Sequence, residues 1–402
     1  MRSLRQLKAC GTNRVRAGIA VLAGTATVLV AAAAYSADPP PILAAETSDV
    51  AVLPPPGPHR VLVGSSFMGG VRVIDGDSGE VKGQFYTSYA ANFAIDPNNT
   101  YYYVAETFWS HGNRGTRSDL LSIYDNQLKF VTEVPLPGRL IVVPKSPTLG
   151  VSGDGHWAYV YNMQPASSVA VVDLQTRKLS TVVETPGCGM IYPWQQAGFS
   201  MLCADGTVAS VAPKGHGFAV THSTPFFDGE KDPVFEESLV DRTTNRAFFI
   251  SYTGQVYDAQ LTPEFHVDHK WSLQQAAGLQ PATTSGLEYT WRPGGAHFAA
   301  YHRATGLLYV LMHVGTHWTH KWDGTEVWVF DTHTQQRVRR IALPSAASVI
   351  TVSQDPQPLL FAIAGFGGGE HANEMQIMKA DTGEVLHSVK GAAGEFAAVM
   401  GF

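Results

Sequence analysis

A short β-strand pattern recurs along the 402 residues and constrains the fold more than any other feature. Each copy is a β-rich run that ends in Asp, followed by a polar turn and a second β-rich run. This pattern is typical of a β-hairpin, because alternating β-formers share one face and Asp favours turns. The clearest copies span residues 71–85, 121–136, 169–183, 327–341 and 375–389, a looser copy spans 254–268, and a degenerate copy without Asp spans 206–222.

Each hairpin is preceded by another β-rich run, and most of these runs by a fourth short run that ends in a turn, such as 92–99 and 238–245. Seven four-stranded antiparallel units are the signature of a β-propeller. We therefore predict an all-β fold, a seven-bladed β-propeller; a pair of β-sandwiches is the alternative. Residues 271–295 form the widest gap between units and predict an insertion with a short helix.

The first unit lacks its innermost strand. The C-terminal stretch 395–402 resembles 92–99, which opens the second unit. We predict that the first blade is closed by this C-terminal strand, because an open ring would leave an unpaired sheet edge.

The first 37 residues have the composition of a cleaved export signal. Arg2, Arg5, Lys8, Arg14 and Arg16 form a basic region without acidic residues, and the apolar run 17–34 follows. The alternative is a membrane anchor, for which the run is long enough. The predicted organisation is a signal peptide over 1–37, a Pro-rich lead-in over 38–58 and the propeller domain over 59–402.

Removal of the signal peptide takes away five positive charges, so the formal net charge changes from −6 to about −11. An acidic exported protein is poorly suited to bind nucleic acid or an anionic membrane. Cys10 leaves with the signal peptide, and Cys188 and Cys203 remain. A pair in an oxidising compartment predicts one disulfide, with two buried free thiols as the alternative.

Five of the fifteen histidines lie between residues 297 and 320: His297, His302, His313, His317 and His320. Zinc enzymes that use close histidines usually place them four apart on a helix with a carboxylate nearby. This stretch instead alternates strands with a loop that contains His317, Trp318, His320 and Trp322. We expect no metal site here, but a scaffold with a loop that contacts a partner.

The chain contains no G-x-S-x-G, H-E-x-x-H, phosphate-binding glycine loop or C-x-x-C-H motif, and no paired carboxylates are visible in the sequence. We therefore expect no catalytic residue and no bound cofactor in this chain.

Several segments, in the same order, resemble the heavy subunit of the methylamine and aromatic amine dehydrogenases. They are residues 114–125, 164–174, 187–206, 291–313 and 319–341. The likeness extends from about residue 59 to the end, and residues 231–235 and 312–338 look closer to the aromatic amine branch.

The resemblance implies a periplasmic propeller that assembles as two heavy and two light chains. The light chain would carry a tryptophan tryptophylquinone cofactor and the catalytic base, and electrons would pass to a small copper protein such as azurin or amicyanin. The activity would be oxidative deamination of a small primary amine, with aromatic amines favoured, to an aldehyde and ammonia. Quinone chemistry of this kind belongs to a cofactor and not to propeller side chains.

The resemblance also assigns roles to single residues. Phe67, followed by Met68, matches the loop at the mouth of the substrate channel, although an ordinary loop aromatic is the alternative. Cys188 and Cys203 match the family's intrachain disulfide. Two other classes of protein remain as alternatives: a stand-alone propeller enzyme such as a lactonase, and a propeller that only binds a ligand.

Overall fold

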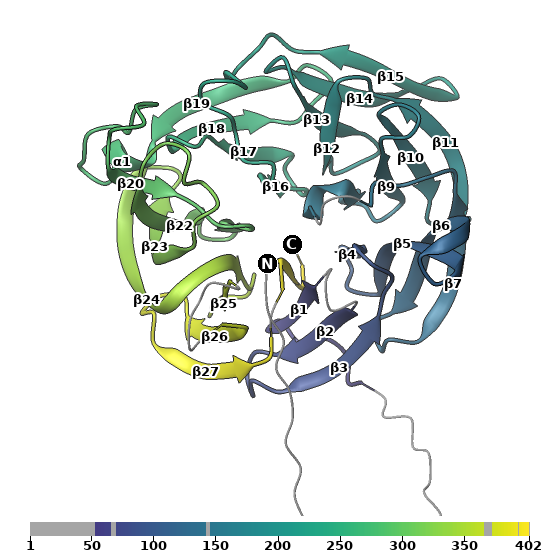
Figure 1. The fold of residues 1–402 in the computed structure, drawn as a ribbon, viewed down its shortest axis with the longest axis horizontal. Coiled ribbons are helices and arrows are strands. Elements are labelled where there is room, and N and C mark those ends of the chain that lie inside the picture. The colour runs from purple at the N-terminus through teal and green to yellow at the C-terminus, as the bar shows by residue number, and fades with distance from the viewer. Residues whose placement is uncertain (1–52, 66–69, 142–144, 366–371, 393, 402) are drawn as a thin grey trace, which may run out of the picture. The chain divides into compact units, whose positions relative to one another are not determined.

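The computed structural model describes residues 53–65, 70–141, 145–365, 372–392 and 394–401. Within this part of the chain the sheets succeed one another around a central axis, and the fold is an all-β propeller (Figure 1). The only helical segments among these residues are η1 (Ser146–Thr148) and α1 (Leu273–Ala276). The second lies in the insertion where a short helix was predicted. No helix of the described part has the length and apolar character that a membrane crossing requires.

Two predicted segments fall largely outside this part. The predicted signal peptide over 1–37 lies entirely outside the described residues, and of the lead-in over 38–58 only residues from Leu53 onward are described. Both therefore stay predictions.

Five sheets are four-stranded and antiparallel. The first, from the innermost strand outward, contains β28 (Phe396–Val399), β1 (Arg60–Ser65), β2 (Gly70–Asp75) and β3 (Val81–Tyr86). The second contains β4 (Asn92–Ile95), β5 (Tyr101–His111), β6 (Arg114–Asp125) and β7 (Phe130–Leu136). The third contains β8 (Leu149–Val151), β9 (Trp157–Asn162), β10 (Ser168–Asp173) and β11 (Lys178–Glu184). The fourth contains β12 (Cys188–Pro193), β13 (Phe199–Cys203), β14 (Val208–Lys214) and β15 (Gly217–His222). The fifth contains β16 (Leu239–Asp241), β17 (Arg246–Ile250), β18 (Gln255–Gln260) and β19 (His266–Ser272).

The remaining strands form one sheet of eight. They are β20 (Thr290–Pro293), β21 (Ala299–His302), β22 (Leu307–Gly315), β23 (Gly324–Asp331), β24 (Gln336–Val352), β25 (Leu359–Ala364), β26 (Glu374–Lys379) and β27 (Val385–Lys390). The prediction of seven separate blades is therefore wrong: the described residues form five four-stranded sheets and this larger one. The cause is β24, which pairs with β23 through its first half and with β25 through its second half. No glycine or asparagine interrupts its 17 residues to force a turn.

The predicted closure of the first blade is confirmed. β28 pairs antiparallel with β1, and Val61 lies opposite Val399. Beyond β28, the Gly401 N–H donates to Asn99 Oδ1 at 3.0 Å, and Arg303 donates to the Gly401 carbonyl oxygen. In Figure 1 the yellow C-terminal segment lies beside the purple first sheet. The last strand thus fills an edge that the first three strands of the blade leave open.

The core lies between neighbouring sheets, where buried side chains from facing strands pack together. One cluster joins β1–β3 to β4–β6, and another joins β5–β7 to β8–β10. The outermost strands alternate instead, as in β11, where exposed residues flank a buried Val183. Burial of one such valine or leucine side chain contributes about 1.5–3 kcal/mol. Each sheet therefore depends on both neighbours, which favours a closed ring.

Antiparallel order gives the ring two different faces. The turns from first to second strand and from third to fourth strand lie on one side, which we call the turn face. The hairpins from second to third strand and the connections to the next sheet lie on the other side, which we call the loop face. The predicted Asp turns are on the turn face: Asp173 Oδ1 accepts hydrogen bonds from the backbone N–H groups of Gln175 and Thr176 at 2.8 and 2.9 Å. Asp75, Asp125 and Asp331 close their turns in the same way.

Candidate functional site

The predicted channel residues Phe67 and Met68 lie outside the described residues. The structure describes the ends of the two strands that flank them in the sequence. β1 ends at Ser65 and β2 begins at Gly70, and these are the second and third strands of the first sheet. The two strand ends therefore lie on the loop face, where the longest connections of the molecule also lie.

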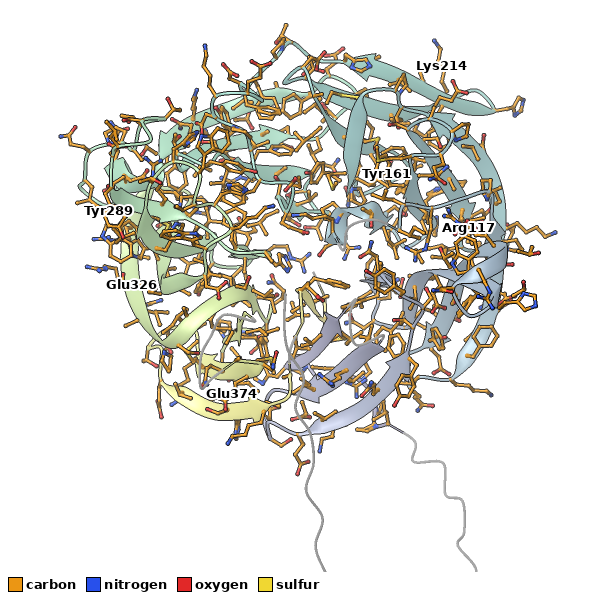
Figure 2. All side chains as sticks on the ribbon, in the orientation of Figure 1. Arg117, Tyr161, Lys214, Tyr289, Glu326 and Glu374 are labelled. Atoms are coloured by element: carbon orange, nitrogen blue, oxygen red, sulfur yellow. A yellow bond between two sulfur atoms is a disulfide. The ribbon has the colours of Figure 1, made fainter. Side chains whose placement is uncertain are left out.

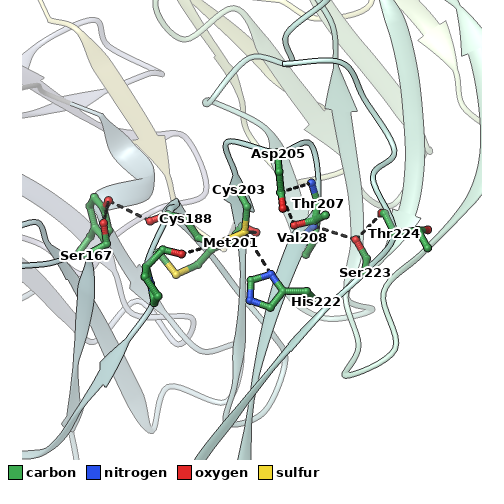
Figure 3. Close-up of a disulfide and its surroundings, with 12 residues drawn as sticks. Ser167, Cys188, Met201, Cys203, Asp205, Thr207, Val208, His222, Ser223 and Thr224 are labelled. Atoms are coloured by element: carbon green, nitrogen blue, oxygen red, sulfur yellow. Dashed lines mark hydrogen bonds between the residues drawn. A yellow bond between two sulfur atoms is a disulfide. The ribbon is translucent and has the colours of Figure 1, made fainter. Parts of the chain in front are cut away.

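The pair Cys188 and Cys203 forms a disulfide, with the two sulfur atoms 2.06 Å apart. The two residues lie directly opposite each other where β12 begins and β13 ends. This places the bond at the loop-face edge of the fourth sheet (Figure 3). The prediction of one disulfide is confirmed, and the alternative of two free thiols is excluded.

His222 Nδ1 lies 3.8 Å from Cys203 Sγ, beside the disulfide (Figure 3). Among the described residues, these three side chains are the only group of His, Cys, Asp and Glu spaced closely enough to hold a metal ion. Metal ligation by cysteine requires the thiolate, and both sulfurs are already bonded to each other. The group therefore does not form a metal site while the disulfide is intact.

Two histidines of the histidine-rich stretch hold strands and loops together. His302 Nε2 lies 3.0 Å from the Asp355 carbonyl oxygen, which links the end of β21 to the turn after β24. His313 Nε2 lies 2.7 Å from Thr319 Oγ1, across the base of the loop 316–323. Burial, with the nearby charge of Arg292, lowers the pKa of His313 to about 4, so its imidazole is neutral at physiological pH.

His317 and His320 do not themselves form an exposed contact surface, which corrects our expectation for this loop. His317 is only 1% exposed, and its Nε2 lies 2.7 Å from the Lys231 carbonyl oxygen. The His320 ring stacks on Tyr252, with centroids 3.8 Å apart. Both imidazoles tie the loop to the fifth sheet and its connections, because a buried polar ring is retained where it finds a partner.

The large apolar side chains that this loop exposes are its tryptophans. Trp318 is 58% exposed and Trp322 is 53% exposed. Trp318 contacts the His317 ring at 4.6 Å and the Tyr252 ring at 6.1 Å, and Trp322 lies 5.8 Å from His313. The buried histidines therefore hold two exposed indoles in place.

The large exposed apolar side chains of the described residues, including these tryptophans, lie in two locations. Seven lie on outermost strands, and none of the described large ones lies in a turn of the turn face. The loop face carries Tyr86, Tyr89, Phe108, Met163, Leu279, Leu287, Tyr289, Trp318 and Trp322. Aromatic side chains dominate this set, and exposed aromatics are typical of protein interfaces.

Hydrogen bonds to Arg292 and Glu288 also hold the insertion before β20 in place. Arg292 is buried, and its Nη2 donates to Glu288 Oε2 at 2.9 Å and to the Thr283 carbonyl oxygen at 2.8 Å. Glu288 Oε2 in turn accepts from the Thr283 N–H at 2.6 Å. These bonds fix a segment on which Leu287 and Tyr289 are exposed; Figure 2 shows Tyr289 at the rim of the ring.

Comparison with known proteins gives a match along nearly the whole propeller. The methylamine dehydrogenase heavy chain family matches residues 60–399. The chain belongs to this family. The methylamine dehydrogenase heavy chain of Methylophilus methylotrophus is 27% identical over 321 residues, which cover 79% of this chain and 76% of that protein. The one from Paracoccus versutus is 28% identical over 320 residues, which cover 79% and 72%.

Solved structures support the fold alone. A functionally unknown protein from Desulfotomaculum acetoxidans matches with a TM-score of 0.59 and 14% identity, over 85% of this chain and 99% of that one. The dihydro-heme d1 dehydrogenase NirN, in complex with DHE, matches with a TM-score of 0.51 and 16% identity, over 83% of this chain and 64% of that one.

Membership of the methylamine dehydrogenase heavy chain family supports an oxidoreductase subunit that acts as part of an amine dehydrogenase, and it implies a light-chain partner. In that setting the loop face is the candidate site. Sequence reasoning identified its two tryptophans but missed Arg292, Glu288 and Tyr252, which anchor it. The only signal for Arg292 and Glu288 was their position at the end of the long connection 273–289, and no signal pointed to Tyr252.

Proposed function

We propose that this chain is the heavy subunit of a periplasmic, quinone-dependent amine dehydrogenase, and that its loop face holds the light chain. The observation that carries the proposal is the match of the methylamine dehydrogenase heavy chain family to residues 60–399, which span every blade. The assembly we propose has two heavy and two light chains.

The character of the loop face supports a protein partner. Trp318 and Trp322 are large, exposed and in contact with the rings of Tyr252 and His313, so they lose less conformational freedom when they bind. Tyr289 is exposed on the segment that the Arg292–Glu288 bond holds. Trp and Tyr are also the residues that most often supply the largest share of interface energy. A light chain that covers this face would bury most of the exposed aromatic surface of the described residues.

Tryptophan tryptophylquinone, carried by the light chain, would supply the electrophilic carbonyl and accept the electrons of the amine. This chain's own contribution is to position that subunit and to wall the path by which the substrate arrives. We assign the channel mouth to Phe67 and Met68, because the flanking strand ends lie on the loop face. No residue of this chain takes part in bond making in this proposal.

The substrate we propose is a small primary amine, with aromatic amines favoured, and the products are an aldehyde and ammonia. The support for the aromatic branch is the sequence of residues 231–235 and 312–338. For the electron acceptor we propose a small copper protein such as azurin or amicyanin, reached after export and removal of residues 1–37.

The test is native purification from the periplasm of cells grown on an amine, followed by intact-mass measurement and an absorbance scan. We expect a small, disulfide-rich second chain in equal amount and a visible quinone band that an added amine bleaches. A panel of alkyl and aryl amines then identifies the preferred substrate. A single colourless chain from such cells would contradict the proposal and leave a binding propeller.

A further inference from the structure

A cavity lies along the axis of the propeller and is formed by this chain alone. Its walls come from the innermost strands β4, β8, β12, β16, β21 and β28 and from the inner half of β24. Most of the lining is apolar, with Phe93, Leu149, Ile191, Leu239 and Phe396 among the largest side chains. The cavity is partly open to solvent, and its volume is about 190 Å³. Apolar walls with a few polar groups are typical of small-molecule sites.

The polar groups at the loop-face end of this cavity are centred on Glu237. Its side chain is 5% exposed and lines the cavity, and its Oε1 accepts a hydrogen bond from the Ser146 N–H at 3.0 Å. Lys145 is near, but its Nζ bonds to Glu236 Oε2 at 3.2 Å, and neither of these two residues lines the cavity. The nearest cation is thus paired with the outer carboxylate, while the inner carboxylate faces the cavity.

Two further polar groups line the cavity, the Ser146 hydroxyl and the His297 imidazole. The Ser146 side chain interacts with the Glu237 carboxylate, and among the described residues the buried His297 Nδ1 has no hydrogen-bond partner. Burial and the charge of Lys145 lower the pKa of His297 to about 4, so its imidazole is neutral and can accept a hydrogen bond. Buried polar atoms of this kind are costly unless a bound group satisfies them.

We propose that the axial cavity binds an organic ammonium cation, whose N–H groups donate to the Glu237 carboxylate and to the neighbouring Ser146 and His297, and whose hydrocarbon body packs against the apolar inner strands. The cavity is lined by residues of this chain alone. It would hold the same class of cation that the proposed reaction consumes.

Other ligands fit less well. A carboxylate ligand would be repelled by Glu237 at this end. A hard metal ion would need several oxygen ligands, and the described residues offer no closely spaced group of carboxylates here. Arg242 also lines the cavity, but it follows β16 (Leu239–Asp241), whereas Glu237 precedes that strand, so the two residues lie at opposite ends of it. An ammonium group bound at Glu237 therefore lies far from that guanidinium.

The charged groups around Glu237 also predict how binding depends on pH. Burial raises the pKa of Glu237 to about 7 against the opposing charge of Lys145, while Glu236 adds a smaller effect in the same direction as burial. His297 stays neutral above its own pKa of about 4. An ammonium ion prefers the ionised carboxylate, so its binding below pH 7 must release a proton.

The test uses the full protein as purified, with any partner attached, and N,N-dimethylbenzylamine as the probe. This tertiary ammonium cannot condense with a quinone carbonyl, so it is not consumed, and its dependence on Glu237 reports on the cavity. Calorimetry at about pH 8 should give one site per chain. Benzyl alcohol and phenylacetate should bind at least about tenfold more weakly, because they lack the charge-assisted hydrogen bond.

The matched variants are Glu237→Gln and Glu236→Gln. The first keeps an acceptor for the Ser146 N–H and should weaken binding of the probe at least about tenfold. The second removes the partner of Lys145 and leaves the Glu237 carboxylate in place, so it should weaken binding less than the first. In the unaltered protein the probe should bind about tenfold more weakly at pH 6 than at pH 8. Titrations in two buffers with different ionisation heats should show proton release at pH 6, and this measurement requires no variant.

Equal binding of the neutral or anionic probe would overturn the proposal, as would unchanged binding in Glu237→Gln or no binding at millimolar concentration. The outcome is independent of the proposed function. A protein without quinone or light chain would still bind the probe, and a working amine dehydrogenase could fail to bind it.

Discussion

The two faces of the propeller are made by the same strands but differ in almost every other respect. On the turn face the connections are short, and Asp75, Asp125, Asp173 and Asp331 close turns by accepting backbone hydrogen bonds. The loop face has the longest connections, such as 223–238 and 273–289, and this face carries the disulfide, the anchored tryptophans and most exposed aromatics of the described residues. The turn face therefore stabilises the fold, whereas side chains of the loop face are available to bind a partner.

The pKa values of carboxyl groups on the two faces are also shifted in opposite directions. On the turn face, hydrogen bonds from the His333 and Thr334 N–H groups lower the pKa of Asp331, so its charge stabilises the fold. At the loop-face end of the axis, burial raises the pKa of Glu237 to about 7, so its charge costs stability. A group retained at a cost to stability is a candidate for function.

The two largest expected effects are of similar size, and the first is on association. Replacing both Trp318 and Trp322 with Ala should weaken light-chain binding about 100-fold, or roughly 2.7 kcal/mol, because buried aromatics supply much of an interface's energy. Stability should change little, since both indoles are more than half exposed. Surface plasmon resonance with the isolated light chain measures the first effect, and thermal unfolding measures the second.

The matched control is Phe130→Ala, which removes a half-exposed aromatic from the outermost strand β7. It should leave association unchanged. If Phe130→Ala weakened binding as much as the double variant, the partner would not be confined to the loop face.

The next effect is on the stability of the fourth sheet. Replacing both Cys188 and Cys203 with Ser should lower the free energy of unfolding by about 3 kcal/mol, because the bond closes a loop of 15 residues in the unfolded chain. Denaturant unfolding in the presence and absence of reductant measures this. The double variant should be insensitive to reductant, and equal sensitivity of the two proteins would show that the bond does not form in solution.

A smaller effect of opposite sign is expected from Glu237→Gln. The folded-state pKa lies above the unfolded one, so the wild-type group loses stability as the pH rises from about 4.5 to 7. The variant lacks this loss and should be more stable at pH 8 by about 1–3 kcal/mol. Unfolding curves at pH 5 and 8 should show the difference growing with pH. A difference that stayed constant would mean that Glu237 titrates normally.

The smallest effect is expected on the turn face. Asp331→Ala removes the acceptor of two backbone N–H groups and should cost about 0.5–1.5 kcal/mol at neutral pH, without changing light-chain binding. Because the folded pKa is lowered, this contribution should fade as the pH falls below about 4. Glu133→Ala, at an exposed position on β7, should be neutral. A loss of binding in Asp331→Ala would contradict the division into two faces.

Much of the fold could be predicted because it is encoded locally. Alternating β-formers and Asp turns mark each hairpin, and the likeness of 395–402 to 92–99 identified the strand that closes the ring. The number of separate sheets could not be predicted. β24 continues from one unit into the next, and whether two halves of a strand bend apart depends on the sheets packed on either side.

The candidate site was predictable only in part. A run such as 316–323 shows that tryptophans and histidines lie close together, but not which of them are buried. His317 is buried because the Lys231 carbonyl, 86 residues earlier in the chain, lies against it, and Arg292 is fixed by a loop that folds back over it. Such contacts depend on neighbouring connections that sequence spacing does not reveal.

By itself the sequence determined the class of fold and the turns, since both follow from residue type at fixed local spacing. It also indicated the disulfide pair, through the number of cysteines, and the family, through the resemblance of several segments. Only the tertiary structure decided which polar groups are exposed to solvent or paired with an opposite charge, and which are buried without one. Glu236 and Glu237 are adjacent in sequence, yet one pairs with Lys145 and the other faces an apolar cavity. The physical reason is desolvation, which depends on the strands that surround a group and not on its neighbours in the chain.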